Sequence, residues 1–325
     1  MNVSPGPAVT SKDARGQQRN KIMTNQTISA ITLLGFPNLS SINVLMFFFL
    51  LTSYCFSIFI NLAIIGLVIK NESLHSPMYF LLTQLSLTDI LWATNIIPNM
   101  LSTLFSNGVK MSLTACLTQF FFFGASESAE CLFLMVMSYD RYMAICNPLH
   151  YTSKMTNALC LKLVILSWVL SFFILLHETI SISQLDFCGP NVIDHFFCDY
   201  APLLQLSCSD TFYIRILTYI MGSPLIFFPF ILIVISYAYI AFIILRIPTS
   251  SGRQKTFSTC SSHLAVVCMY YGTLMAIYVV PSEGRSLTLN KVLSMAYTIL
   301  NPLLNPIIYS LRNNDIKRAL RKLGK

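Results

Sequence analysis

Charged residues are scarce in this sequence. Its 325 residues include 21 Lys or Arg and 13 Asp or Glu, which is 10% of the chain, whereas a soluble globular domain carries about 25%. So few charges cannot cover the water-facing surface of soluble domains of this size. Disorder is also excluded, because disordered chains are poor in aromatic residues and 13% of this chain is aromatic. An apolar content of 55% and a mean hydropathy of +0.65 predict an integral membrane protein.

The first 20 residues contain no apolar stretch, so we expect no cleavable signal peptide and expect the first hydrophobic segment to direct insertion. Alternating segments of about 10 residues, which a transmembrane β-barrel requires, are also missing. Long unbroken apolar runs are present instead, and a helix of roughly 20 such residues crosses a bilayer. Seven segments qualify, at 44–69, 78–100, 113–144, 159–176, 212–245, 263–280 and 292–311. The expected fold is all-α, a bundle of seven transmembrane helices.

The distribution of basic residues predicts the orientation of this bundle. With seven spans, the two termini lie on opposite sides, and loops rich in Lys and Arg stay in the cytoplasm. Few basic residues fall in the loops opposite the C-terminus, namely Lys110, Arg215, Arg285 and Lys291. We expect an extracellular tail at 1–43, a seven-helix receptor domain at 44–311 and a cytoplasmic tail at 312–325. The net charge of +8 then reflects topology and anionic lipid rather than nucleic-acid binding.

Four of the ten cysteines fall on the expected outer side: Cys116, Cys188, Cys198 and Cys208. Disulfides persist on that side, and the four residues allow three pairings. His195 and Cys198 offer half a metal site at most, since a structural zinc site needs four ligands. Asn25, in the sequon Asn25-Gln26-Thr27 of the outer tail, is the expected glycosylation site.

Several motifs resemble those of known receptors. Asp140-Arg141-Tyr142, Trp168 and NPIIY at 305–309 resemble the rhodopsin-like G-protein-coupled receptors. Longer strings resemble the olfactory receptors: PMYFL at 77–81, MSYDRYMAIC at 137–146, HFFCD at 195–199, KTFSTCSSHL at 255–264 and PLLNP at 302–306. One such string would be weak support, whereas five in order are specific. The resemblance covers nearly the whole chain.

The resemblance implies two disulfides, Cys116–Cys198 and Cys188–Cys208, and a pocket for a small molecule within the bundle. The implied lining comprises Phe120, Phe123, Gly124, Glu127 and Ser128 from the third span, His177 at the outer rim, Met221, Gly222 and Leu225 from the fifth span, and Tyr271, Leu274, Met275 and Tyr278 from the sixth. Most of these are apolar or aromatic, as is usual in small-ligand pockets.

Glu127 is the most informative of these residues. It lies 11 residues beyond Cys116, which places it roughly 16 Å down the third helix and near the bilayer midplane. An acid at that depth is costly and usually functional. Two interpretations are open: Glu127 anchors a polar ligand, or it is neutral and bonded to a neighbouring helix.

Asp89 in the second span and Glu130 in the third are two further intramembrane acids. By resemblance they occupy the place where rhodopsin-like receptors hold a sodium ion, with Asn61 and Asn301 nearby. The alternative is a pair of carboxyls that share a proton without an ion. Apart from this sodium ion, no cofactor is expected.

The expected inner end carries the candidate switch. Arg141 can pair with the adjacent Asp140 and be released as helices move. By resemblance, the G-protein switch comprises Asp140, Arg141, Tyr142, Tyr237, Asn305, Pro306 and Tyr309. Residues 315–325 have the pattern of a basic amphipathic helix on the inner membrane surface.

These features predict an odorant receptor of the plasma membrane, in sensory-neuron cilia, and not an enzyme. It would bind a small volatile molecule and activate a stimulatory heterotrimeric G protein of the olfactory type, which raises cAMP. The first rival is a rhodopsin-like receptor for a small metabolite or a peptide. A transporter is disfavoured because the sequence has no inverted repeat. An intramembrane enzyme is disfavoured because no Ser/His or His/Glu pair shares one depth of the bundle.

Overall fold

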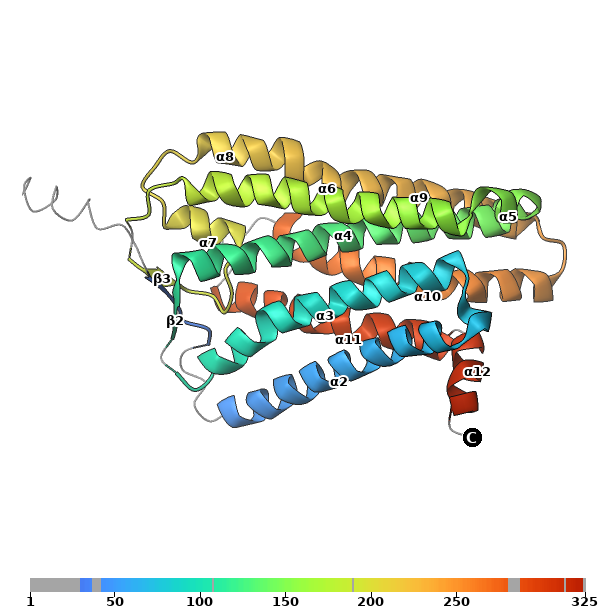
Figure 1. Ribbon diagram of the computed structural model, residues 1–325, viewed down its shortest axis with the longest axis horizontal. Coiled ribbons are helices and arrows are strands. Elements are labelled where there is room, and N and C mark those ends of the chain that lie inside the picture. The colour runs from blue at the N-terminus through green and yellow to red at the C-terminus, as the bar shows by residue number, and fades with distance from the viewer. Residues whose placement is uncertain are drawn as a thin grey trace, which may run out of the picture.

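The computed structural model describes residues 30–36, 42–106, 108–188, 190–279, 287–312 and 314–323. Seven of its helices are long and apolar enough to cross a membrane, which confirms the predicted all-α bundle (Figure 1). Below, the outer end is the end that carries the β-strands, and the inner end is the one that carries helix α12. Asn25 and the rest of residues 1–29 lie outside the described residues.

The spans follow one another along the chain. The first four are α2 (Asn43–Lys70), α3 (Pro77–Thr103), α4 (Leu113–Cys146) and α6 (Asn157–Ser183). The fifth consists of α8 (Phe212–Leu217), a π-helical segment (Thr218–Gly222) and α9 (Ser223–Arg246), the sixth of α10 (Ser250–Leu274) and a π-helical segment (Met275–Val279), and the seventh is α11 (Leu287–Arg312). Short elements complete the chain: β1 (Ala30–Leu33), β2 (Val109–Ser112), α5 (Tyr151–Lys154), β3 (Val192–Ile193), α7 (Tyr200–Gln205) and α12 (Asn314–Leu323).

Local chemistry sets several of these boundaries. Helix α4 begins where the Ser112 hydroxyl accepts a hydrogen bond from the Ala115 amide at 3.1 Å, and α6 begins with the same contact from Leu159 to Thr156 at 3.2 Å. Such caps satisfy amides that have no partner within the helix. The π-helical segment of the fifth span ends two residues before Pro224, which has no N–H to continue the regular hydrogen-bond ladder.

Two spans extend seven or more residues beyond their predicted apolar runs. Helix α6 continues from the predicted end at 176 to Ser183, and α10 begins at Ser250 rather than near 263. Both extensions are rich in polar residues, which a hydropathy scan excludes although they are compatible with a helix. As a result, His177 and Glu178 lie on a helix and not in the outer loop where the sequence had placed them.

Helix α4 is the central element of the bundle. In its most apolar 18-residue window, 78% of the residues are buried, against 17% in the corresponding window of the fifth span. The residues that face other helices therefore concentrate on α4, and this helix carries more of the candidate site residues than any other element. The fifth span instead presents much of its surface outward.

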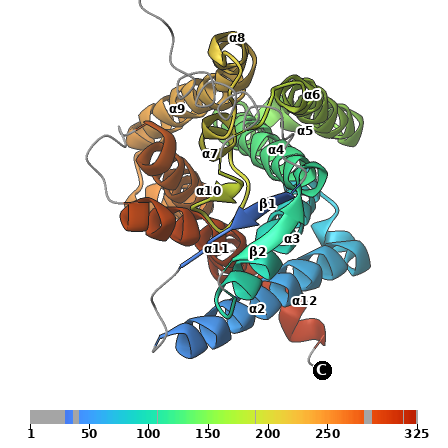
Figure 2. The same cartoon turned by 90° about the vertical axis from the view of Figure 1, so that its left-hand side faces the viewer.

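A small β-sheet, which the sequence did not predict, covers part of the outer end (Figure 2). Strand β1 is its middle strand and pairs antiparallel with β2 and parallel with β3. Strand β1 belongs to the segment before the first span, and β3 belongs to the loop between the fourth and fifth spans. The sheet thus joins three outer segments, and its side chains Ile31 and Leu33 are fully buried.

Lys291 fixes this sheet to the seventh span. Predicted to lie in an outer loop, it instead lies near the start of α11 with only 6% of its side chain exposed. Its Nζ donates to the carbonyl oxygen of Gly35 at 2.6 Å and pairs with Asp194 Oδ1 at 2.5 Å. Gly35 has a φ of +62°, which glycine adopts without strain. The apolar run predicted for this span starts after Lys291 because the charge interrupts it.

The inner end of the seventh span is tied to the first span. Pro306 lacks an N–H, so the Pro302 carbonyl loses its usual helical donor. The Ser57 hydroxyl at 2.8 Å and the Asn61 amide at 3.0 Å donate to that carbonyl instead. Beyond α11, α12 turns across the inner end and buries Ile316 and Ala319 (Figure 1).

We expect Lys291→Met to lower the thermal stability of the purified protein. The change removes both contacts of the ammonium group, and a hydrogen bond to a charged group is worth about 1.5–3 kcal/mol. Because 40% of the Asp194 side chain is exposed, water takes over part of this contact, and a loss of about 1–2 kcal/mol is expected.

The matched control is Lys110→Met, which removes an exposed lysine from the neighbouring strand β2. The unfolding temperatures of the two variants are compared at one pH and one salt concentration, and that of Lys291→Met is expected to be lower. Equal temperatures for Lys291→Met and the control would contradict the proposed role of Lys291.

Candidate ligand-binding site

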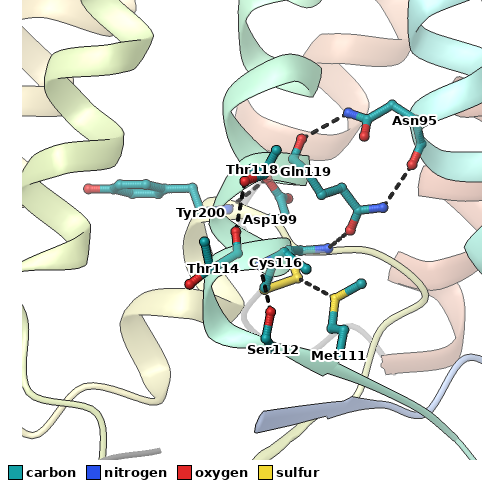
Figure 3. Close-up of a disulfide and its surroundings, with 11 residues drawn as sticks. Asn95, Met111, Ser112, Thr114, Cys116, Thr118, Gln119, Asp199 and Tyr200 are labelled. Atoms are coloured by element: carbon teal, nitrogen blue, oxygen red, sulfur yellow. Dashed lines mark hydrogen bonds between the residues drawn. A yellow bond between two sulfur atoms is a disulfide. The ribbon is translucent and has the colours of Figure 1, made fainter. Parts of the chain in front are cut away.

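The outer wall of the site is fixed by two disulfides. Cys116 at the start of α4 is joined to Cys198, with 5.5 Å between their Cα atoms, and Cys188 is joined to Cys208 at 5.9 Å. This is the pairing that the sequence resemblance implies. The first bridge fastens the second outer loop to the central helix of the bundle (Figure 3).

A hydrogen-bond network surrounds the Cys116–Cys198 bridge (Figure 3). Gln119 Nε2 donates to the Asn95 carbonyl at 2.9 Å, and Asn95 Nδ2 donates to the Gln119 carbonyl at 2.8 Å. Gln119 Oε1 also accepts from the Cys198 amide at 2.9 Å. The network therefore holds α3, α4 and the outer loop in one arrangement. Neither Asn95 nor Gln119 was identified from the sequence.

His195 packs between aromatic rings of the same loop. Its ring lies 4.5 Å from that of Phe196 and 4.7 Å from that of Phe197, measured between centroids. Burial, followed by the nearby Lys291 charge, lowers the pKa of His195 to about 4. The imidazole is therefore neutral at physiological pH. Because Cys198 Sγ is bonded to Cys116, it cannot supply the thiolate that a His195–Cys198 metal site would need.

Glu127 lies at the centre of the candidate site. Its carboxylate oxygen Oε1 accepts a hydrogen bond from Tyr297 of α11 at 2.5 Å, and its backbone carbonyl accepts one from Tyr270 of α10 at 2.8 Å. The contact with Tyr297 agrees with the interpretation that Glu127 is bonded to another helix. Its side chain nevertheless remains partly accessible, although Ser126 and Ser128 on either side are buried. The exposed part of Glu127 is available for contact with a bound molecule.

Aromatic residues from four helices surround Glu127. The ring of Trp92 on α3 lies 5.2 Å from that of Phe123 and 4.8 Å from that of Tyr297, and Tyr270 packs against the same tryptophan. Trp92 is fully buried, and its indole N–H has no hydrogen-bond partner among the residues that the structure describes. Trp92, Tyr270 and Tyr297 were not predicted as site residues. The presence of a tryptophan in a span next to one that carries an intramembrane acid is a signal that could have identified Trp92.

Several of the predicted pocket residues belong to the packed core: Phe123, Tyr271 and Leu274 lie in one buried cluster, and Phe120 and Leu225 lie in another. Phe120, Phe123 and Ser128 are buried on α4, and the ring of Tyr271 on α10 packs at a tilt against that of Phe230 of α9, with 4.8 Å between their centroids. The other predicted residues lie as follows: Leu225 and Leu274 are buried, Met221, Gly222 and Met275 are partly exposed, His177 is exposed on α6, and Tyr278 lies outside the described side chains.

Gly124 has a packing role that its place in the predicted pocket did not suggest. A Cβ added at this position would lie 2.6 Å from Leu175 Cδ1 of α6. The missing side chain therefore allows α4 and α6 to approach each other closely. Its contribution to a ligand pocket stays a prediction.

A fourth acid, Glu178, was missed because the fourth span was predicted to end before it. The residue is 7% exposed on α6, and its carboxylate accepts a hydrogen bond from the Thr218 hydroxyl. Thr218 begins the π-helical segment that also contains the predicted pocket residues Met221 and Gly222. Such segments are frequent at functional sites, so Glu178 extends the candidate site toward the fourth span.

Below Glu127, Asp89 and Glu130 meet at a single amide. Asn305 Nδ2 donates to Asp89 Oδ1 at 3.1 Å and to Glu130 Oε1 at 3.0 Å. Asp89 Oδ2, Glu130 Oε2 and both polar side-chain atoms of Asn301 are buried without a hydrogen-bond partner in the described part of the chain. Buried polar atoms in this condition usually face water or an ion. The set of oxygen donors suits a hard cation such as sodium.

At the inner end, Arg141 is held by its neighbour. Its Nε and Nη2 donate to Asp140 Oδ2 at 3.0 and 2.5 Å, and Tyr151 donates to Asp140 Oδ1 at 2.8 Å. Of the other predicted switch residues, Tyr237 bonds to His263 Nδ1 at 2.6 Å, and Tyr309 is buried with its hydroxyl unbonded among the described residues. Tyr142 packs against Tyr239, with 6.2 Å between ring centroids. His263 was not assigned to the switch from the sequence.

Comparisons with known proteins extend these observations. The family model described as "Olfactory receptor" matches residues 48–324. Human "Olfactory receptor 11L1" is 45% identical over 91% of this chain and 92% of its own length, and rat "Olfactory receptor 1468" is 43% identical over 91% and 95%. Among solved structures, squid rhodopsin matches with a TM-score of 0.62 over 90% of this chain and 89% of its own.

Squid rhodopsin shares only 16% sequence identity with the chain, so this likeness shows the seven-helix fold alone. The family match covers most of the chain, and the relatives are similar over nearly their whole length. The chain is therefore a multi-pass plasma-membrane protein of the G-protein-coupled type and belongs to the olfactory receptor family.

Proposed function

We propose that this protein binds a small volatile molecule beside Glu127 and activates a stimulatory heterotrimeric G protein of the olfactory type, which raises cAMP. The observation that carries the proposal is the partly accessible Glu127 deep in the bundle, whose carboxylate accepts a hydrogen bond from the seventh span and whose backbone carbonyl accepts one from the sixth. Sensory-neuron cilia are the proposed location.

The ligand would bind among aromatic rings and few polar groups. Glu127 would set its orientation, and Trp92 offers an indole N–H that has no partner among the described residues. An amine would form a charge-assisted hydrogen bond with an ionised Glu127, whereas a carbonyl or ether oxygen would accept one from a protonated Glu127. Both cases favour oxygenated or amine odorants over plain hydrocarbons.

Ligand binding at Glu127 would change how α4 is joined to the sixth and seventh spans. A ligand that takes the carboxylate away from Tyr297 weakens the contact between α4 and α11, and the two helices can then rearrange. The ligand shifts the equilibrium only by its difference in affinity for the two arrangements. No covalent step is involved.

Asp89, Glu130, Asn301 and Asn305 lie between the ligand site and the inner end, and they would hold the sodium ion. When bound, the ion supplies positive charge to two carboxylates and lowers their repulsion. Asn305 belongs to the NPIIY motif and is bonded to both acids. Movement of α11 would therefore disturb this cluster directly.

At the inner end, release of Arg141 from Asp140 would complete the switch. Tyr237 and Tyr309 are its proposed partners in the active arrangement. Tyr237 would then have to leave His263, and Asp140 would keep its bond to Tyr151.

A panel of odorants tested on cells expressing the receptor, with cAMP as readout, tests the proposed function. If no small volatile molecule raises cAMP above the level of untransfected cells, the proposal fails.

We expect Glu127→Gln to change the ranking of ligands while surface expression stays normal. The amide keeps an oxygen that can accept from Tyr297, so the bundle remains connected, but it cannot carry the negative charge. Amine ligands should lose roughly tenfold or more in potency, since a charge-assisted bond is worth about 1.5–3 kcal/mol. Apolar ligands should change little.

Dose–response curves for amine, oxygenated and hydrocarbon ligands measure this effect. Ser126→Ala is the control, because the Ser126 hydroxyl bonds to the Phe122 carbonyl of its own helix. Tyr297→Phe removes the hydroxyl that bonds to Glu127 and keeps the acid. This variant should instead change the potency of all ligands by a similar factor. A uniform small shift in Glu127→Gln would show that Glu127 is structural.

We expect Arg141→Ala to leave the receptor at the cell surface but to abolish its cAMP response. Arg141 pairs only with the adjacent residue Asp140 among the described contacts, so its loss should cost little stability. Loss of the coupling between the ligand site and the G protein should lower the response by about 100-fold or more, to the level of untransfected cells. Surface labelling and cAMP are measured together, and Arg215→Ala at the outer end is the control. A normal response from Arg141→Ala would refute the switch.

A further inference from the structure

Glu178 is a buried acid that has no role in the proposed function. It lies on α6 with 7% of its surface exposed, and its Oε1 atom accepts a hydrogen bond from the Thr218 hydroxyl of the fifth span. Leu175, Glu178 and Ile182 are all buried and follow one another at helical spacing. Glu178 therefore belongs to the face of α6 that packs into the bundle, and not to the face that meets lipid.

The contact between α4 and α6 gives the spacing of Glu178 and Glu127. Gly124 of α4 and Leu175 of α6 lie at one level of the bundle, because a Cβ on Gly124 would be 2.6 Å from Leu175 Cδ1. Glu127 follows Gly124 by three residues toward the inner end, and Glu178 follows Leu175 by three residues toward the outer end. The two acids are therefore about 9 Å apart along the bundle axis. The charge of Glu178 still acts on Glu127 at this separation.

Neither acid is paired with a basic side chain in the described part of the chain. The ion pairs there all involve aspartates. Glu127 and Glu178 each accept a hydrogen bond from a neutral hydroxyl group instead, of Tyr297 and Thr218 respectively. The second carboxylate oxygen of each acid makes no hydrogen bond to the described residues, so both can accept from a ligand.

Other charged groups near the two acids are already engaged or face outward. Asp199 also acts on Glu127 through its charge, but its Oδ1 atom accepts from the Tyr200 amide at 2.8 Å and caps α7 (Figure 3). Arg215 on α8 is exposed, and its Nε donates to the Thr211 hydroxyl at 3.2 Å. His177, which precedes Glu178, is exposed. The protein thus leaves the two buried acids without a cation of its own.

A buried donor beside Glu127 independently indicates a bound molecule. Trp92 is fully buried, and its indole N–H has no hydrogen-bond partner within the described ranges. Its ring packs 4.8 Å from that of Tyr297, which bonds to Glu127, and 5.2 Å from that of Phe123, four residues before Glu127. Buried polar groups in this condition usually face water or a bound group.

From this arrangement we propose that the site selects a diamine, with one ammonium group at Glu127 and the other at Glu178. The inference rests on the proposed function, which places a small ligand beside Glu127. Both amino groups of an alkyl diamine are protonated at neutral pH, as a lysine side chain is. The dication neutralises two acids in a region where an unpaired charge is costly. Glu178 is then the residue that separates diamines from monoamines.

The spacing of the acids sets the chain length of the preferred diamine. A saturated chain advances about 1.3 Å per bond, given bonds of about 1.5 Å and angles near 111°. Each contact between an ammonium nitrogen and a carboxylate oxygen adds about 2.8 Å. A diamine of about four to six carbons therefore bridges two carboxyls whose axial separation is about 9 Å.

The test measures binding to the purified full-length receptor by isothermal titration calorimetry. The ligands are putrescine, cadaverine and hexamethylenediamine, with butylamine, pentylamine and hexylamine as matched monoamines. The best diamine is expected to bind at least about tenfold more tightly than its monoamine, because it makes a second charge-assisted hydrogen bond. Decamethylenediamine, whose chain is too long, should lose this advantage.

Three substitutions separate recognition by Glu178 from a structural role. Glu178→Gln should weaken diamine binding by about tenfold or more and leave monoamine binding unchanged, since the amide can still accept from Thr218. Glu127→Gln should weaken the binding of both classes. Glu178→Asp withdraws the carboxyl by one methylene group and should shift the preference toward a diamine about one carbon longer. A structural role for Glu178 does not produce such a shift.

Asp186→Asn is the matched control, because it removes an exposed acid of the same outer end, where Asp186 bonds to Ser209. Diamine affinity should stay unchanged in this variant. Thermal unfolding of each variant checks that the bundle is intact. An equal loss of affinity in Asp186→Asn and Glu178→Gln would show that only the overall charge of the outer end matters.

Equal affinity of the unmodified receptor for diamines and their monoamines would overturn the proposal, and so would binding of neither class. In both cases, a cAMP response to other odorants would leave the proposed function standing. Conversely, selective diamine binding without any cAMP response would contradict the proposed signalling and support the diamine site.

Discussion

The bundle depends on one constraint: within the hydrocarbon region, a polar group must find its partner inside the protein. The carbonyl of Pro302 shows how this works, because Pro306 removes its helical donor and Ser57 and Asn61 of the first span replace it. Glu127 and its two tyrosines meet the same requirement across three spans. These polar contacts therefore join particular helices within a bundle whose core is otherwise largely apolar. A ligand or ion that competes for one of these contacts acts on the arrangement of the helices.

Hydropathy predicted the seven spans because each of them is clearly more apolar than the loops on either side. The same method ended the fourth span before Glu178 and began the seventh after Lys291, since a scan treats charge as the end of a helix. In the structure both residues are buried, and each has a polar partner supplied by a distant segment. Such partners are separated by many residues in the chain, so no local pattern reveals them.

The candidate site also contains residues that a local sequence pattern identified and residues that only the packing of the helices reveals. The spacing along the third span identified Glu127, Glu130 and their neighbours on α4, because helical periodicity places them without knowledge of other helices. Trp92, Tyr270 and Tyr297 come from three other spans, and their positions around Glu127 follow from how the helices pack. Gly124 was placed on the correct helix, but its contact with Leu175 of α6 required the packed structure.

Strand β1 has a consequence for the order in which the molecule is completed during synthesis. The strand is among the first segments to leave the ribosome, yet it pairs with β3 at Val192–Ile193, and the turn after it bonds to Lys291 of the last span. Neither partner exists until most of the chain has been made. The earliest part of the protein is thus among the last to reach its final place. The sheet with its Lys291 contacts is therefore a mark of a fully inserted chain, because a truncated product that lacks the seventh span also lacks those contacts.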